Sequence, residues 1–462
     1  MISTRGGFDM EGALMSANGS PTPNLAACLE AYDRRLLLPG TKGLALTAPL
    51  PQRELALRQW RVLEAETGFP VAVLKASALA HNARWMRAYC EHFGVQLAPH
   101  GKTTMSPQLF ARQLDGGAWG MTLATAAQVV TAYHFGVRRI LLANQLVAPA
   151  EIQSLLLLLR NDPAFKAYVV VDSAEGIERL ATGIDAIDPG RPLPLLIELG
   201  VPSGRTGCRS DHDALMLARK IAQTPGLMLV GVEGYEGLLV GADRAADLAG
   251  VEAFLNRLLH FTAALDRENL FSGQDIFISA GGTAYFDRVA VALQRIASLS
   301  RPLTPILRSG CYLTHDHGFY NRLLADMAGR QPDLFAKLPA GGLQPALEVW
   351  SMVQSHPEPT LAILTMGKRD VSHDIDLPLP LWRHRPGSAA HPKGLPSGCR
   401  IEKMNDQHAY LRLPDELAQQ LQVGDIVGCG VSHPCTTFDK WSLLLEVDEQ
   451  YRVVGAVNTE FG

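Results

Sequence analysis

The sequence predicts an α/β fold in which a closed (β/α)8 barrel is followed by a mostly antiparallel β domain. Between residues 95 and 307, short apolar runs alternate with helical stretches, which is the pattern of parallel strands joined by helices. After about residue 330, apolar runs come at short spacing with turn residues between them. An open doubly wound sheet is the alternative for the first part, and the number of strands favours the barrel.

The barrel prediction rests on eight apolar runs. They are residues 95–99, 119–123, 139–143, 168–172, 193–199, 227–232, 275–279 and 304–307. Helical stretches separate most of them, at residues 107–114, 126–135, 150–160, 174–181, 211–222, 245–267 and 284–298. We expect the C-terminal ends of the strands to meet at one rim, where barrel enzymes carry their active sites.

Three domains are expected: an N-terminal arm with one helix, the barrel, and the β domain, at residues 1–65, 66–325 and 326–462. The arm is rich in Gly, Pro, Ser and Ala at first, and its polar stretch over residues 53–66 predicts the helix. Within the β domain, residues 414–421 predict a helix. The proline-rich, basic segment 378–398 predicts an exposed loop.

Composition excludes several classes of function. The chain has 462 residues, 47% hydrophobic, with a net charge of −4, so we expect neither a nucleic-acid partner nor an anionic membrane. The longest leucine run, residues 155–159, is far too short for a membrane span. No secretory signal is visible, and seven cysteines in so long a chain do not suggest a disulfide framework. A cytoplasmic protein is expected.

Polar and glycine-rich residues follow the predicted strands. They are His100, Lys102, Thr125, Asn144, Asp172, Arg205, Tyr235, Gly281, Gly282, Thr283, Ser309 and Gly310. Gathered at one rim, they predict a ligand site. Glycines that follow a strand and precede a helix let backbone N–H groups approach a phosphate. A lysine beside such a cradle suggests pyridoxal phosphate, because the lysine amine forms a Schiff base with the aldehyde.

A second predicted site lies near the C-terminus. His433 and Cys435 are two positions apart, and alternate residues of an extended chain face the same side. Both are good zinc ligands, although zinc sites usually have at least three protein ligands. His408 is one candidate for a third ligand, and substrate or water is another.

Six motifs in one order resemble the D-serine dehydratase / D-threonine aldolase family, whose barrel is of the alanine racemase type. They are HGKT at 100–103, ELGVPSGRTG at 198–207, GVEGYEG at 231–237, SAGGT at 279–283, RSGCY at 308–312 and SHPC at 432–435. The resemblance spans roughly residue 65 to the C-terminus.

The resemblance implies a role for each residue. Lys102 would form the internal Schiff base and take the Cα proton, and His433 and Cys435 would bind zinc beside the cofactor. Arg205 and Tyr235 would line the cofactor ring, and His100 would be a further cofactor-binding residue. The phosphate would be held by Gly281, Gly282, Thr283, Gly310 and Tyr312.

The resemblance also implies an activity. The dehydratase branch carries His-x-Cys at this place and the aldolase branch His-x-Asp, so Cys435 favours deamination of D-serine or a related D-β-hydroxy amino acid by β-elimination. One alternative is a D-threonine or 3-hydroxyaspartate aldolase. A racemase would need a second acid/base on the opposite face of the cofactor, for which the sequence offers no secure candidate. A non-catalytic pyridoxal phosphate-binding protein would have no use for zinc ligands. Relatives pair β domain against barrel, which implies a homodimer.

Two further segments have an open assignment. His315 and His317 either read a substrate carboxylate or belong to an exposed polar loop. Residues 366–374 form either a rim segment near the zinc or a charged turn.

Overall fold

The computed structural model describes residues 23–241, 243–296, 298–418 and 420–461, so the first part of the predicted arm, residues 1–22, lies outside the described residues. Helix α2 (Leu25–Arg34) comes first, followed by the short antiparallel pair β1 (Leu36–Leu37) and β2 (Leu50–Pro51). The helix predicted over residues 53–66 is wrong. Three 3₁₀ turns replace it: η1 (Gln52–Glu54), η2 (Ala56–Arg58) and η3 (Val62–Glu64).

Backbone conformation explains this difference. Gln59 and Ala65 adopt left-handed φ values of 55° each, which end the turns before them. Leu55 and Val62 are fully buried in a core shared with the β domain. Tertiary packing therefore determines the backbone conformation of this segment, and the polar periodicity of its sequence does not.

The predicted barrel is confirmed. Its eight parallel strands are β4 (Gln96–Leu97), β5 (Met121–Leu123), β6 (Arg139–Gln145), β7 (Lys166–Val171), β8 (Leu193–Leu199), β9 (Leu227–Gly234), β10 (Ile276–Ala280) and β11 (Leu303–Leu307). Their order is β4-β11-β10-β9-β8-β7-β6-β5. The ends of this curled sheet meet, because Trp119 N–H donates to Leu97 O at 2.7 Å and Thr122 N–H to Pro99 O at 2.9 Å.

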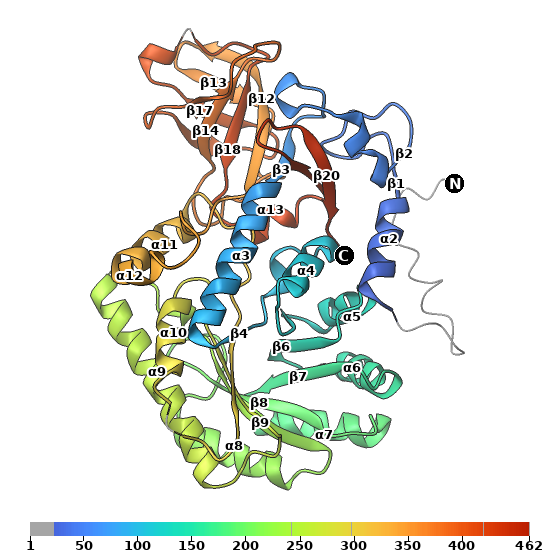
Figure 1. The fold of residues 1–462 in the computed structure, drawn as a ribbon, viewed down its shortest axis with the longest axis vertical. Helices are drawn as coiled ribbons and strands as arrows, with labels where there is room; N and C mark the ends of the chain where they lie inside the picture. Colours follow the sequence, from blue (N-terminus) through green and yellow to red (C-terminus); the bar gives the residue numbers. More distant parts are fainter. Residues whose placement is uncertain (1–22, 242, 297, 419, 462) are drawn as a thin grey trace.

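Helices cover the outside of the barrel (Figure 1). They are α4 (Pro107–Asp115), α5 (Ala126–His134), α6 (Pro149–Asn161), α7 (Ala174–Ile187), α8 (Asp211–Gln223), α9 (Arg244–Arg267) and α10 (Phe286–Leu293). Inside, one buried cluster is made by Ala98, Leu141, Val170, Leu196, Val230, Phe277 and Ile306. Helix α4 begins as expected for its sequence, with Ser106 accepting a hydrogen bond from Leu109 N–H and Pro107 in the first turn. The N-cap at Ser106 therefore sets the point at which the segment carrying Lys102 ends and α4 begins.

The predicted antiparallel β domain is also confirmed. Its strands are β12 (Leu347–Glu358), β13 (Leu361–Leu364), β14 (Leu379–His384), β15 (Lys393–Gly394), β16 (Arg400–Met404), β17 (Ala409–Arg412), β18 (Ile426–Gly430), β19 (Leu443–Val447) and β20 (Val453–Asn458). Two short helices, α11 (Phe319–Arg330) and α12 (Pro332–Phe335), precede it.

Three local predictions in and around this domain need correction. The segment predicted as a loop over 378–398 contains β14, because its backbone pairs with β18 despite the prolines, with a register shift after Pro380. The predicted helix over 414–421 is a 3₁₀ turn, η6 (Asp415–Leu417). Strand β3 (Val71–Lys75), in the range expected for the barrel, pairs with β12 and β19.

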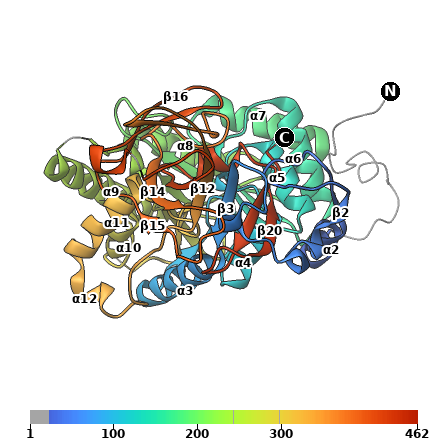
Figure 2. The same cartoon turned by 90° about the horizontal axis from the view of Figure 1, so that it is seen from above.

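Strand β3 ties the two domains together. It lies among strands of the C-terminal domain in both views (Figure 1, Figure 2) and leads directly into helix α3 (Ala76–Phe93) beside the barrel. The β domain is thereby held over the barrel rim. Among the helices of the described residues, none combines the length and apolar character needed to cross a membrane.

Candidate active site

A cavity of about 250 Å³ opens at the C-terminal ends of the barrel strands, and residues of both domains line it. Nine of the eleven residues predicted for the site lie on its wall. They are His100, Lys102, Arg205, Tyr235, Gly282, Thr283, Gly310, His433 and Cys435. The cavity therefore brings the predicted lysine site and the predicted metal pair together.

Lys102 lies in the 3₁₀ turn η4 (Gly101–Thr103), which directly follows β4. Within the described residues its Nζ has no hydrogen-bond or ion-pair partner. Burial lowers the pKa of Lys102, and the nearby charge of Arg205 lowers it further. A larger share of the amine is therefore neutral than for an exposed lysine, and the neutral amine is the nucleophilic form.

The glycine turn is already occupied by a carboxylate. Gly281 N–H donates to Glu236 Oε2 at 3.0 Å, and Gly282 N–H donates to Glu236 Oε1 at 2.9 Å. Burial raises the pKa of Glu236, although these hydrogen bonds oppose that shift. Gly281 itself has φ +85°, a left-handed conformation that favours glycine.

Tyr312 lies away from this cavity. It is 2% exposed and lines a different cavity together with Cys90 and Gln113, near helices α3 and α4. The structure thus separates Tyr312 from the other residues predicted to hold a phosphate. Gly310, only two positions earlier, lines the same cavity as Lys102, and a Cβ there would lie 2.5 Å from His100 O.

Two buried polar nitrogens of the cavity lack partners among the described residues. Arg308 forms an ion pair with Glu233 and donates to Gly234 O at 2.9 Å, but its Nε–H has no acceptor. His100 Nδ1 is also buried without a partner, and burial lowers the pKa of His100 so that the ring is neutral. Unpartnered buried polar atoms are unusual in folded proteins and fit a polar ligand bound at this place.

The sequence predicts His433 and Cys435 on an extended chain, but the backbone between them turns. After β18 the chain turns, Pro434 is helical (φ −56°, ψ −43°), and Cys435 begins the short helix α13 (Cys435–Phe438). Both side chains nevertheless line the cavity. The turn at Pro434 therefore brings both side chains to the cavity, as the alternation of an extended chain was expected to do.

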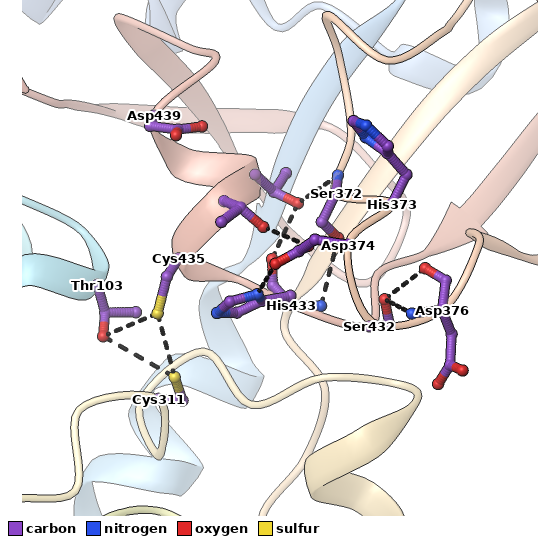
Figure 3. A network of polar contacts seen from close by, with 12 residues as sticks. Thr103, Cys311, Ser372, His373, Asp374, Asp376, Ser432, His433, Cys435 and Asp439 are labelled. Atoms are coloured by element: carbon purple, nitrogen blue, oxygen red, sulfur yellow. Dashed lines mark hydrogen bonds and ion pairs between the residues drawn. The ribbon is translucent and has the colours of Figure 1, made fainter. Parts of the chain in front are cut away.

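Figure 3 shows how these two side chains are supported. His433 Nδ1 lies 2.6 Å from Asp374 Oδ2, and Thr436 Oγ donates to Asp374 Oδ1 at 2.8 Å. Cys435 Sγ lies 3.6 Å from Cys311 Sγ and 3.4 Å from Thr103 Oγ. Ser372 and Asp374 thus place the end of segment 366–374 beside His433, in agreement with its assignment as a rim segment.

These contacts shift both ionisation equilibria. The Cys311 thiol, followed by His433 and Thr103, holds the pKa of Cys435 well below its usual range, against the effect of burial. Burial alone would lower the pKa of His433, but Cys435 and Asp374 raise it to about 9. The lowered pKa of Cys435 favours its thiolate, and this negative charge lies beside His433, which can be cationic or bind a metal.

A third protein ligand for a metal is not evident. In the ranges that the structure describes, no group of three or more His, Cys, Asp or Glu side chains is arranged to hold a metal ion. His408 is exposed in the turn between β16 and β17, so it is not that ligand. His315 is 1% exposed and His317 is largely buried, so their assignment to an exposed polar loop is wrong. Neither side chain lines the cavity.

Sequence reasoning missed several residues of the cavity wall. They are Thr103, Ala124, Ala143, Glu198, Glu233, Arg308, Cys311 and Tyr320. Five of these residues stand inside motifs already singled out, and that position was the signal available: Thr103, Glu198, Glu233, Arg308 and Cys311. Tyr320, at the start of α11, had no such signal.

Comparison with known proteins gives two family matches. A model described as "Alanine racemase, N-terminal domain" matches residues 74–296, and one described as "Putative serine dehydratase domain" matches residues 346–447. Among curated proteins, the chain is 25% identical over 372 residues to a D-threonine aldolase from Arthrobacter sp, covering 80% of this chain and 86% of the relative.

Two further similarities agree with these matches. The chain is 27% identical over 320 residues to a 3-hydroxy-D-aspartate aldolase from Paracoccus denitrificans, covering 68% of this chain and 76% of the relative. The solved structure of D-threo-3-hydroxyaspartate dehydratase from Delftia sp. HT23 shares the fold, with a TM-score of 0.64 at 21% identity over 85% of this chain and 98% of that one.

Proposed function

Because the chain belongs to the D-serine dehydratase / D-threonine aldolase family, we propose that it deaminates D-serine or a related D-β-hydroxy amino acid in a reaction that depends on pyridoxal phosphate and zinc. The observation that carries this proposal is a single one. Lys102 from the barrel and the His433–Cys435 pair from the β domain line the same cavity.

The cavity suits pyridoxal phosphate. Lys102 has a lowered pKa and, among the described residues, no competing partner. The unpartnered Nε–H of Arg308 and ring nitrogen of His100 can bind polar atoms of the cofactor. When bound, the cofactor supplies an electron sink that acidifies the Cα–H of an attached amino acid. Lys102 would hold the cofactor by its aldehyde and then take the Cα proton.

The phosphate end of the cofactor needs a more specific assignment. Thr283 and Gly310 line the cavity, but the N–H groups of Gly281 and Gly282 already donate to Glu236. A phosphate can take those two donors only if the Glu236 carboxylate gives them up. Tyr312, which lies outside the cavity, has no direct part in phosphate binding in this proposal.

The donor atoms of His433 and Cys435 suit zinc. An imidazole nitrogen and a thiolate are typical zinc ligands, and the lowered pKa of Cys435 favours the thiolate. With two protein ligands, substrate and water would complete the coordination. A zinc ion there would place positive charge beside the β-hydroxyl, which otherwise is a poor leaving group.

Aldol cleavage is the second candidate function. Both curated relatives named above are aldolases that act, by name, on D-threonine and 3-hydroxy-D-aspartate. The same cavity serves either outcome, because Lys102 and a metal beside the β-oxygen suit both bond cleavages. Cys435 in place of an aspartate favours elimination.

A substrate assay tests the proposal. Protein loaded with pyridoxal phosphate and zinc would be mixed with D-serine or L-serine, and pyruvate and ammonia would be measured with and without a chelator. We expect turnover of the D-enantiomer, suppressed by chelation. His433→Ala should remove it, whereas His408→Ala, a matched change outside the cavity, should not. Turnover that is unchanged by chelation and by His433→Ala would contradict the metal role.

The homodimer implied by the resemblance remains a prediction. Sedimentation velocity of the full chain would test it, with a mass of twice 50.0 kDa expected.

A further inference from the structure

A second cavity, of about 360 Å³, lies in the β domain where β14 ends and β18 begins. Its wall carries Arg383, His384, Arg385, Lys393, Gln420 and Asp425, with His391 at its edge. Strand β18 separates it from the active site, because β18 starts at Ile426 beside this cavity and leads out of Gly430 toward His433. None of the reactions described above uses these residues.

The charge of this cavity opposes that of the whole chain. Three permanent cations, Arg383, Arg385 and Lys393, face one carboxylate, Asp425, so the local balance is three minus one, or +2, with the histidines neutral. The chain as a whole carries −4. Basic residues concentrated in a concave site of an acidic protein produce a local field that attracts anions.

The single carboxylate is already used. Arg385 binds Asp425 through two hydrogen bonds, Nε to Oδ1 at 2.7 Å and Nη2 to Oδ2 at 3.0 Å. Arg383 donates to Gln420 Oε1 at 2.6 Å, which is a neutral acceptor. Among the described residues, neither Arg383 nor Lys393 forms an ion pair. Two cations therefore remain without a counter-charge.

Strand pairing makes this arrangement unfavourable without a ligand. Arg383 and Lys393 stand directly opposite each other in the antiparallel pair of β14 and β15. Like charges at opposed positions of two strands destabilise the pairing. An anion between the two side chains would turn this repulsion into two attractive contacts.

The chemistry of the two unpaired cations identifies the anion. Arg383 and Lys393 stand opposite each other, so their side chains lie on the same face of the β14–β15 pair. His384, the next residue along β14, faces the other side of the strand and does not share this anion contact. Arginine forks match the oxygens of phosphate.

From these observations we propose that this basic cavity binds the phosphate group of a small phosphorylated molecule, at a site separate from the barrel. Arg383 and Lys393 supply both the charge and the hydrogen-bond donors. The volume of about 360 Å³ leaves room for a phosphate with a small organic group attached.

Calorimetric titration of the full, pyridoxal phosphate-loaded chain with inorganic pyrophosphate tests this proposal, with succinate as a carboxylate probe. We expect pyrophosphate to bind with a Kd below about 1 mM. Arg383→Gln/Lys393→Gln should weaken binding about tenfold or more. The matched double variant Arg400→Gln/Lys403→Gln removes the same charge from β16 of the same domain and should leave binding unchanged.

Three results would overturn the proposal: no binding of pyrophosphate, equal binding of succinate, or equal weakening by both double variants. If Arg383→Gln/Lys393→Gln fails to fold, the single variant Lys393→Gln, at an exposed position, replaces it. Hydrogen exchange provides the second readout. Protection by pyrophosphate is expected in residues 383–393 and 420–425, and protection confined to the barrel would contradict the proposed site.

Discussion

His433 Nδ1 lies 2.6 Å from Asp374 Oδ2, in the same cavity wall that carries Cys435. A carboxylate bound to one ring nitrogen fixes the orientation of the ring and leaves the other nitrogen, Nε2, for a ligand. Thr436 donates a hydrogen bond to Asp374 and fixes its carboxylate in turn. Asp374 therefore orients the His433 ring in addition to balancing its charge. This arrangement is the usual support of a metal-binding histidine.

Asp374→Asn should therefore weaken zinc binding by about 10- to 100-fold without removing a ligand, because the amide supports the ring less well. Competition against a chromophoric chelator measures the change. Asp376→Asn, two positions further on the same rim, is the matched control and should leave zinc affinity unchanged. Equal effects of both variants would show that the contact between Asp374 and His433 has no special role.

Cys435→Ala should lose zinc and lower the elimination rate by about 100-fold or more, because a metal ion contributes several kcal/mol at a leaving group. Bound pyridoxal phosphate should be retained, since Lys102 is untouched. Zinc content and visible absorption are the two measurements. Cys399→Ala, a buried cysteine elsewhere in the β domain, is the control. Full zinc content in Cys435→Ala would refute the ligand assignment.

Lys102→Ala should abolish both turnover and the visible absorption of lysine-bound pyridoxal phosphate, because among the described residues Lys102 is the one lysine that lines the cavity. Reduction with borohydride followed by peptide mass analysis should place the cofactor on Lys102 of the native chain. Lys166→Ala, at an exposed barrel position, should change nothing. Cofactor found on a different lysine would rule out the proposed site.

The pH dependence of cofactor incorporation should report the lowered pKa of Lys102. Only the neutral amine attacks an aldehyde, so the rate should rise with pH and reach its midpoint below the ordinary lysine value of 10.5. Arg205 lowers this pKa, and Arg205→Gln should move the midpoint to higher pH. Stopped-flow absorbance measures both profiles. A midpoint at the ordinary lysine value would contradict the half-buried environment of Lys102.

Glu236→Ala should lower the free energy of unfolding of the cofactor-free chain by about 2–6 kcal/mol, because the N–H groups of Gly281 and Gly282 lose their acceptor and each costs about 1–3 kcal/mol. Urea denaturation measures this loss. Pyridoxal phosphate should restore more stability to this variant than to the native chain, if its phosphate takes the same two donors. Equal stabilisation of both proteins would show that the phosphate binds elsewhere.

The order of the elements could be predicted from the sequence because it depends on local patterning. Most barrel strands are short apolar runs followed by a helix with a side-chain N-cap, and Ser106 with Pro107 marks one such start. Long-range pairing could not be predicted in the same way. Nothing near Val71 indicates that β3 joins β12 and β19, which lie hundreds of residues later in the chain.

The same distinction applies to the site. Lys102, Arg205 and His433 could be identified because each stands in a local motif, and the cavity wall does contain them. Glu236 as the acceptor for Gly281 and Gly282, and Cys311 as the neighbour of Cys435, depend on contacts between distant strands. Tyr312 also stands in a motif, but its side chain lines a different cavity, because a motif gives the neighbourhood of a residue and not the direction of its side chain.

The products formed from D-threonine test the central claim most directly, because this one substrate can react in either way. Elimination of the β-hydroxyl gives 2-oxobutyrate and ammonia, whereas cleavage between Cα and Cβ gives glycine and acetaldehyde. With Lys102, His433 and Cys435 acting in one cavity, we predict 2-oxobutyrate and ammonia in equal amounts, formed only from the D-enantiomer and lost on chelation. Glycine and acetaldehyde as the main products would contradict the elimination assigned to this site.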